Sequence, residues 1–238
     1  MEELLKKLQA FDTPTVCNAI ELFNVRPNNR GFMDSRIRCQ FPEMPPMVGF
    51  AATAAFRSCE APQSGDAYGS LEDQLALFET LDGPAVVVFQ DIDDPAVGAT
   101  FGEVMCSTYK AFGAAGLITS GGGRDLQQVR AIEFPVFTGS TICAHAYCHI
   151  LHVGLPVHVG GISVSTGELV HGDENGVTTI PIDIAAEVAD VSSEFVQAER
   201  CVLDYVQSPG KKSIDEFTAR REEMAAAIAK IRSRVARR

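Results

Sequence analysis

The chain has 238 residues, of which 46% are hydrophobic, and it carries a formal net charge of −11 at pH 7. This length and apolar content allow a sizeable core, and no Pro/Ser/Gly-rich linker divides the chain. The acidic balance argues against a nucleic-acid-binding surface, which needs clustered Lys and Arg. The one basic cluster is the final IRSRVARR, which is typical of a solvated helix end.

The cysteines and the first residues indicate where the protein works. Seven cysteines, an odd number, are spread through the chain without a CxxC pair, as is typical of a reducing compartment. The opening MEELLKKLQAF is charged and lacks the apolar core of a secretion signal, and no run approaches the length of a membrane span. We therefore expect a soluble cytoplasmic protein without a membrane partner.

The first half of the chain predicts alternating helices and strands. Helices are expected over 2–10 and 14–23, and the Pro- and Arg-containing segment 24–47 is expected to be a long loop. The strands expected next lie at 48–56, 85–89, 116–119 and 135–137. The helices expected between them lie at 70–81, with Ser70 and Asp73 as a capping box, at 101–112 and at 124–132. This alternation predicts a sheet with parallel strands covered by helices.

The second half changes character. Short strands separated by turns are expected over 157–180, where HGDENG is a polar hairpin turn rather than a calcium loop. A long helix is expected over 184–206, and Ser213 with Glu216 predicts the start of a final helix. Its apolar stripe can pack on its own domain or contact another subunit. We expect one α/β domain over 1–207 with a central mixed sheet and a β-rich module, and a C-terminal helical extension over 208–238.

The stretch TSGGGRDLQQVR, residues 119–130, places three glycines between an expected strand and an expected helix. On such a turn the backbone can approach a ligand closely, and the free N–H groups of the helix start attract anions. Arg124 can grip a carboxylate with two hydrogen bonds, and Asp125 can hold a hard divalent cation. The alternative is an Asp that only favours the helix dipole, beside a surface Arg.

A second expected helix start, GEVM, should lie at the same edge of the sheet, where ligands of α/β folds collect. Its N–H groups could bind a carboxylate. Glu103 could act as acid or base, or hold metal-bound water, and the alternative is an ordinary glutamate of a first helical turn.

Two longer stretches carry a resemblance to a known family. They are GEVMCSTYKAFGAAGLITSGGGRDLQQVRAIEFPVF and PVHVGGISVSTGELVHGDENGVTTIP, together with TPTVCNAI near the N-terminus. Their order resembles the RraA-like family, which contains the regulator of ribonuclease E activity and the metal-dependent 4-hydroxy-4-methyl-2-oxoglutarate aldolases. The resemblance spans roughly residues 10–205. It implies a swivelling β/β/α-type domain, assembled as homotrimers or homohexamers with active sites at subunit interfaces.

The resemblance also implies a class II aldolase chemistry, in which Mg²⁺ or Mn²⁺ binds an α-keto acid and stabilises a pyruvate enolate. Asp125 matches the metal ligand, Arg124 matches the arginine that contacts substrate and the catalytic water, and Glu103 matches the acid that assists that water near the metal. The matching substrate-binding positions are the helix start and a glutamate from the neighbouring subunit: Gly102, the amides of Val104 and Met105, and Glu199.

The chain also departs from the family pattern. Ser120 stands where the family commonly has Asp, which removes a charge from near the metal. An AHAYCHI stretch replaces basic residues after the FPVF strand, so His145, Tyr147 and His149 could alter recognition of a second substrate carboxylate. If helical, His145 and His149 would share one face as a transition-metal pair, with Cys148 beside them. A hydrogen-bonded pocket wall and an acid or base role are the alternatives.

These observations lead to one main hypothesis. We expect a metal-dependent lyase that cleaves a short 4-hydroxy-2-oxo acid or an oxaloacetate-like acid through a pyruvate enolate. The alternatives are a non-catalytic protein-binding regulator and another enolate-forming enzyme such as a dehydratase.

Overall fold

The computed structural model describes residues 1–63 and 70–237. The chain forms two compact units. Residues 1–13 and 31–182 make up the first, and residues 14–30 and 183–238 the second.

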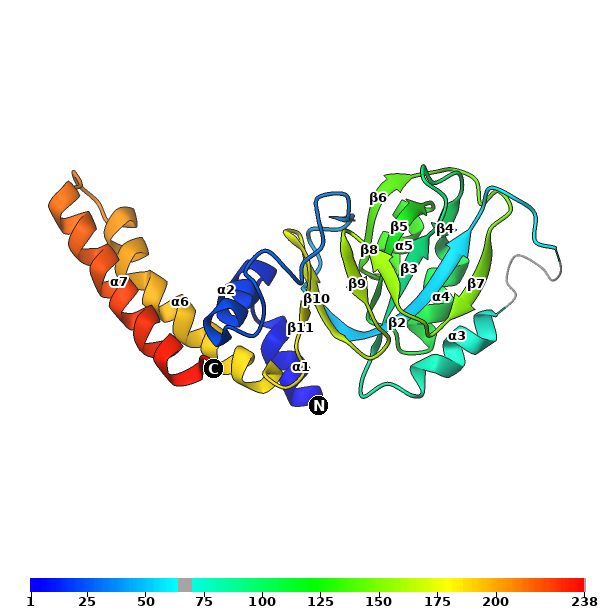
Figure 1. Cartoon of the computed structure of the whole chain (residues 1–238). Coiled ribbons are helices and arrows are strands. Elements are labelled where there is room, and N and C mark those ends of the chain that lie inside the picture. The colour runs from blue at the N-terminus through cyan, green and yellow to red at the C-terminus, as the bar shows by residue number, and fades with distance from the viewer. Residues whose placement is uncertain (64–69, 238) are drawn as a thin grey trace. The chain divides into compact units, whose positions relative to one another are not determined.

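A nine-stranded mixed sheet is the centre of the first unit (Figure 1). Its main path runs β1-β6-β5-β3-β2-β10-β11, while β4 pairs with β5 and β7 pairs with β2. The strands are β1 (Arg38–Cys39), β2 (Met47–Arg57), β3 (Ala85–Asp91), β4 (Ala99–Phe101), β5 (Gly116–Gly123), β6 (Val136–Thr141), β7 (His149–Val153), β10 (Leu169–Asp173) and β11 (Gly176–Ile180). The pairs β2–β3, β3–β5, β5–β6 and β4–β5 are parallel. The predicted central mixed sheet with parallel strands is therefore confirmed.

Both faces of this sheet are covered, which explains why its central strands are largely apolar. Side chains alternate between the two faces of a strand. On β3, Val87 and Phe89 join one core with Phe101, while Val86 and Val88 join the other. The covering elements are α1 (Glu2–Gln9), α3 (Leu71–Phe78), α4 (Glu103–Ala111), α5 (Leu126–Ala131) and the hairpin β8 (Val157–Val159) with β9 (Ile162–Val164).

The second unit is helical and contains α2 (Thr13–Phe23), α6 (Ala185–Gln207) and α7 (Ile214–Val235). The predicted cap of α7 is confirmed, because Ser213 Oγ accepts a hydrogen bond from the Glu216 amide at 3.1 Å. Helices α6 and α7 lie side by side (Figure 1). The apolar stripe of α7 is buried at Ile231 and Val235, whereas Ile214 at its start is 83% exposed.

Two local predictions were wrong. Ser70 does not cap a helix with its side chain, because its φ is 71° and no such hydrogen bond forms; α3 runs from 71 to 78 instead of ending at 81. Strands β1, β4 and β7 were not expected, since a stretch of two to five residues carries little periodicity. The HGDENG segment forms the β10–β11 turn, as predicted.

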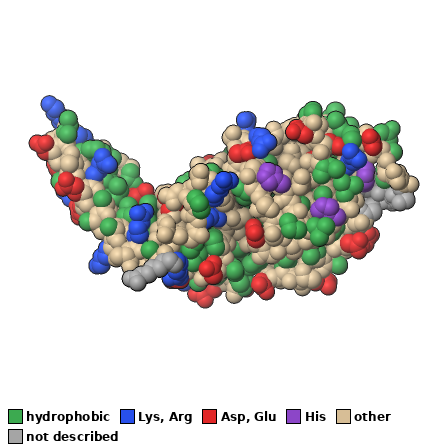
Figure 2. Space-filling model, viewed as in Figure 1, with side chains coloured by type: hydrophobic (Ala, Val, Ile, Leu, Met, Phe, Trp, Pro, Cys, Tyr) green, Lys and Arg blue, Asp and Glu red, His purple; other side chains and the backbone are tan. Residues whose placement is uncertain are grey.

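The surface of the molecule is mixed in charge. On the face drawn in Figure 2, Lys and Arg side chains are interspersed with Asp and Glu side chains. Within residues 1–63 and 70–237, no helix is long and apolar enough to cross a membrane.

Candidate active site

The glycine run ends strand β5 rather than forming the turn that its spacing predicted. Gly122 and Gly123 pair with β4 and with β6. A Cβ on Gly121 would lie 2.2 Å from Thr100 Oγ1, and one on Gly123 would lie 2.3 Å from the Phe101 ring. The glycines are therefore required because the two strands pack too closely for any side chain, and not because their backbone dihedrals demand glycine.

Arg124 and Asp125 follow this strand directly. The Arg124 amide donates to the Phe101 carbonyl at 3.1 Å, which ties the end of β5 to β4. Asp125 precedes α5 with a φ of 55°, in the left-handed region that Asp tolerates better than most residues. The side chain of Asp125 does not cap its own helix.

Instead, the Asp125 carboxylate reaches the start of α4. Its Oδ2 accepts a hydrogen bond from the Glu103 amide at 3.1 Å and lies 3.8 Å from Arg124 Nε. A Cβ on Gly102 would stand 2.6 Å from this oxygen, so the approach requires glycine there. The two helix starts, which are remote in sequence, are thus joined through one carboxylate.

A pocket of about 30 Å³ opens at this junction, at the carboxyl ends of parallel strands. Its lining comprises Ala99, Thr100, Phe101, Gly102, Val104, Met105, Arg124, Asp125, His145 and Cys148. This volume is well below the roughly 300–1,000 Å³ of typical small-molecule pockets. A larger ligand must therefore sit mainly in front of the pocket, where Val104 is 71% exposed.

The structure brings together six of the predicted site residues, and these are Gly102, Val104, Met105, Arg124, Asp125 and His145. The other three lie elsewhere. Glu103 supplies its amide to Asp125, but its exposed side chain does not line the pocket. His149 begins β7, and Glu199 belongs to α6 in the second unit.

The condition for a histidine pair on one helix face is not met. Residues 145–148 form a turn that leads into β7, so His145 and His149 do not share a helix face. His145 Nδ1 lies 2.8 Å from the Ala146 carbonyl, and His149 Nδ1 lies 2.7 Å from the Tyr147 carbonyl. In the described part of the chain, no three His, Cys, Asp or Glu side chains are grouped so that they could hold a metal.

The donor set nevertheless fits one kind of ion. Mg²⁺ binds proteins through one or two carboxylates and completes its shell with water and substrate oxygens. Asp125, partly exposed in the pocket wall, is such a carboxylate. Cys148 does not compete as a thiolate, because burial raises its thiol pKa although Arg124 opposes the shift.

Behind the pocket lies a buried polar network that the sequence pattern did not reveal. Thr119 Oγ1 donates to Thr100 Oγ1 at 3.1 Å and accepts from the Gly121 amide at 2.9 Å. Asp91, which ends β3, is only 8% exposed beside it. The signal in the sequence was a carboxylate that follows the apolar run 85–89 by two residues.

Ser120 does not occupy the place near the metal that its alignment suggested. Its hydroxyl accepts from the Asp91 amide at 2.9 Å, and it lines a separate cleft with Asp91 and Asp93. The residue therefore hydrogen-bonds the neighbouring strand, but it does not line the pocket that contains Asp125.

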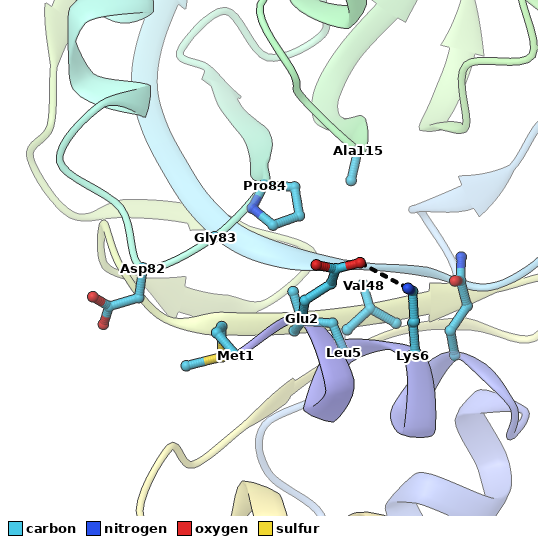
Figure 3. Close-up of a pocket in the computed structure, with 10 residues that line it drawn as sticks. Met1, Glu2, Leu5, Lys6, Val48, Asp82, Gly83, Pro84 and Ala115 are labelled. Carbon is cyan, nitrogen blue, oxygen red and sulfur yellow. Dashed lines mark hydrogen bonds and ion pairs between the residues drawn. The ribbon is translucent and has the colours of Figure 1, made fainter.

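A larger cleft of about 500 Å³ lies next to α1, at the other ends of the parallel strands (Figure 3). Pro84 and Ala115, which line it, directly precede β3 and β5, so the cleft is at the amino ends of the strands. Its Glu2 and Lys6 side chains point toward one another and form an exposed ion pair at 2.7 Å. The smaller pocket is the better candidate, because only it combines an arginine, a carboxylate and a helix start.

Comparison with known proteins agrees with this fold. A family model described as RraA-like, Aldolase/RraA, matches residues 13–179. A protein of Halalkalibacterium halodurans, provisionally named a 4-hydroxy-4-methyl-2-oxoglutarate aldolase, is 33% identical over 119 residues, which are 50% of this chain and 54% of that protein. The chain spans about half the length of this curated relative and of an uncharacterised one from Methanocaldococcus jannaschii, at 54% and 52%.

Two solved structures show the same fold. A Streptomyces coelicolor protein, described as an unusual member of the RNase ES inhibitor RraA family, superposes with a TM-score of 0.67 at 23% identity, over 84% of this chain and 95% of that one. An uncharacterised protein of Pseudomonas syringae pv. tomato superposes with a TM-score of 0.72 at 21% identity, over 93% and 94% of the two chains.

Proposed function

The chain belongs to the RraA-like family, and we propose that it is a divalent-metal-dependent lyase that releases pyruvate from a short 4-hydroxy-2-oxo acid or an oxaloacetate-like acid. The observation that carries this proposal is the meeting of Arg124, Asp125 and the α4 start in one pocket. A surface used only for protein binding has no need of that combination.

In this proposal the carboxylate of the 2-oxo acid binds to the start of α4 and to the Arg124 guanidinium, the two groups in the pocket that attract an anion. The first N–H groups of a helix have no partner within the helix and attract a carboxylate. Val104 and Met105, in the first turn of α4, line the pocket together with Arg124, whose guanidinium can donate two parallel hydrogen bonds.

Asp125 is the residue that would hold Mg²⁺ or Mn²⁺. When bound there, such an ion would supply Lewis-acid stabilisation of the negative charge that develops on the 2-oxo oxygen as the carbon–carbon bond breaks. To Glu103, exposed on the first turn of α4, we assign the role of accepting the proton of a 4-hydroxyl group through water. Decarboxylation of an oxaloacetate-like acid generates the same enolate and needs no such base.

The small volume of the pocket favours an assembly in which another element covers it. We assign this role to a neighbouring copy in a homotrimer or homohexamer, with Glu199 of that copy reaching the substrate. In this scheme His145, in the pocket wall, contacts the part of the substrate that does not become pyruvate. His149, outside the pocket, has no assigned role in this scheme.

A regulator that binds another protein is the second candidate, and the net charge of −11 favours it. One experiment separates the two. Purified protein is incubated with Mg²⁺ or Mn²⁺ and a panel of 4-hydroxy-2-oxo acids and oxaloacetate, with pyruvate release coupled to lactate dehydrogenase. We expect metal-dependent pyruvate formation that a chelator abolishes.

The absence of pyruvate with every compound would overturn the lyase proposal. Co-purification with a ribonuclease, unaffected by Arg124→Ala, would then support the regulator. Turnover without carbon–carbon cleavage would point to a dehydratase.

A further inference from the structure

Strand β5 contains an irregularity just before the candidate site. Thr119 is in register with Thr138 of β6, but the next aligned pair joins Gly122, three positions further along β5, to Ser140, only two positions further along β6. Two residues of β5, at 120–121, therefore lie opposite one residue of β6. Such an insertion is a β-bulge, a feature that occurs next to active sites and changes the direction of the chain beyond it.

The bulge at 120–121 determines how Arg124 and Asp125 leave the sheet. Beyond it, β5 pairs with both β4 and β6, and the Arg124 amide donates to the Phe101 carbonyl at 3.1 Å. A slip of one residue turns every following side chain to the other face of a strand. If the extra residue were drawn into the ladder, Arg124 and Asp125 would shift by one position, and the bond from the Glu103 amide to Asp125 would break.

Two buried threonines hold the bulge. The Thr138 hydroxyl donates to the Gly121 carbonyl at 2.5 Å. The Thr119 hydroxyl accepts from the Gly121 amide at 2.9 Å and donates to Thr100 at 3.1 Å. All three threonines are 0% exposed. Both backbone polar groups of the bulged glycine are thus bonded by side chains.

The shape of Thr138 does not by itself explain a threonine at this position. Valine has the same branched shape and suits a buried strand, as Val136 does two positions earlier on β6. A buried hydroxyl, in contrast, is costly unless it is hydrogen-bonded. The other groups near this hydroxyl are the Ser140 carbonyl at 3.2 Å and the Ser140 amide at 3.3 Å, so its nearest acceptor is the bulge.

We propose that Thr138 is a positioning residue of the proposed lyase. Its hydroxyl, together with that of Thr119, holds the bulge at 120–121 and thereby sets the register in which Arg124 and Asp125 reach the start of α4. The effect on turnover rests on the proposed function. The effect on the bulge is independent of any activity.

The experiment replaces Thr138 by valine, which removes the hydroxyl, and by serine, which keeps it. Thr178→Val is the matched control, because Thr178 is a fully buried threonine of β11 whose hydroxyl donates to the carbonyl of Gly31 at 2.9 Å. Amide hydrogen exchange of the peptide 120–125 is measured for each full-length protein. The kcat/KM for pyruvate release is measured with Mn²⁺ present.

We expect the peptide 120–125 to exchange at least about fivefold faster in Thr138→Val than in wild type, because the Gly121 carbonyl loses this donor and the bulge opens more often. The kcat/KM of the same variant should fall at least about tenfold, since Arg124 and Asp125 are displaced. Thr138→Ser should stay within about threefold of wild type in both measurements, because it keeps the hydroxyl. Thr178→Val should match wild type in both, although it also loses a buried hydrogen bond.

Exchange at the wild-type rate in Thr138→Val would overturn the proposal whatever the activity. Equal effects of Thr138→Ser and Thr138→Val would overturn the role of the hydroxyl, and faster exchange with an unchanged kcat/KM would overturn the positioning role. If wild type releases no pyruvate, the proposed function fails, and the exchange rates still decide whether Thr138 holds the bulge. Should Thr138→Val not fold, Thr119→Val, which removes the acceptor of the Gly121 amide, takes its place with the same expected results.

Discussion

Replacing Gly121 by alanine tests the explanation of the glycine run. The added Cβ would stand 2.2 Å from Thr100 Oγ1 and 2.6 Å from Asp91 Oδ2, so both neighbours must retreat. Both side chains are buried, and Thr119 holds Thr100 by a hydrogen bond. Overpacking of this kind costs about 1–3 kcal/mol. We expect the upper end, because two neighbours are displaced at once.

The free energy of unfolding should be measured by urea titration at pH 7 with circular dichroism, since the chain has no Trp. Gln127→Ala, an exposed change on α5, is the control and should stay within about 0.5 kcal/mol of wild type. A loss of about 2–3 kcal/mol corresponds to a drop in Tm of roughly 4–12 °C. If Gly121→Ala is as stable as the control, close packing is not the reason for the glycine.

Three further predictions concern charged groups. Burial lowers the pKa of His171, whose ring lies between Thr13 Oγ1 and the Leu8 carbonyl. The contribution of neutral His171 to the free energy of unfolding should be complete above about pH 6.5 and be lost as the pH falls below that value. Urea titrations at pH 7.5 and 5.5 should show this loss in wild type but not in His171→Asn. An equal change in the free energy of unfolding between the two pH values in both proteins would contradict the prediction. Although burial raises the pKa of Asp93, hydrogen bonds from Cys59, Ser58 and Arg57 bring this pKa to about 2. Asp93→Asn should therefore lower the free energy of unfolding at pH 7 by about 2 kcal/mol. An unchanged urea midpoint would argue against a stabilising role of these bonds. Arg124→Lys should lower kcat/KM on the order of 100-fold at unchanged stability, because an ammonium cannot make two parallel hydrogen bonds; a loss below about threefold in steady-state assays would refute this role.

The parts of the fold that the sequence predicted depend on local patterns. The buried run at 85–89, the helical stripe on α6 and the Ser213 cap each follow from residues close together in the chain. Ser70 shows the limit of such patterns, because its backbone is left-handed and its side chain makes no capping hydrogen bond.

Several residues of the candidate site could be named from the sequence, but their arrangement could not. Arg124, Asp125 and Gly102 could be singled out, because glycines beside charged residues at helix starts are a local signal. The bond from the Glu103 amide to Asp125 and the burial of Asp91 depend on how β4 and β5 pack. Pairing between residues 22 or 23 positions apart in the chain has no signature in either segment alone.

The central claim is that Asp125 holds a divalent ion which the lyase reaction requires. The most direct test is a Mn²⁺ titration of the chelator-treated protein, in which bound Mn²⁺ and pyruvate release are measured in the same samples for wild type, Asp125→Asn and Gln127→Ala. We predict that bound ion and activity rise together in wild type and Gln127→Ala, and that both are lost in Asp125→Asn. Pyruvate release by Asp125→Asn at the wild-type rate and the same Mn²⁺ concentration would contradict it.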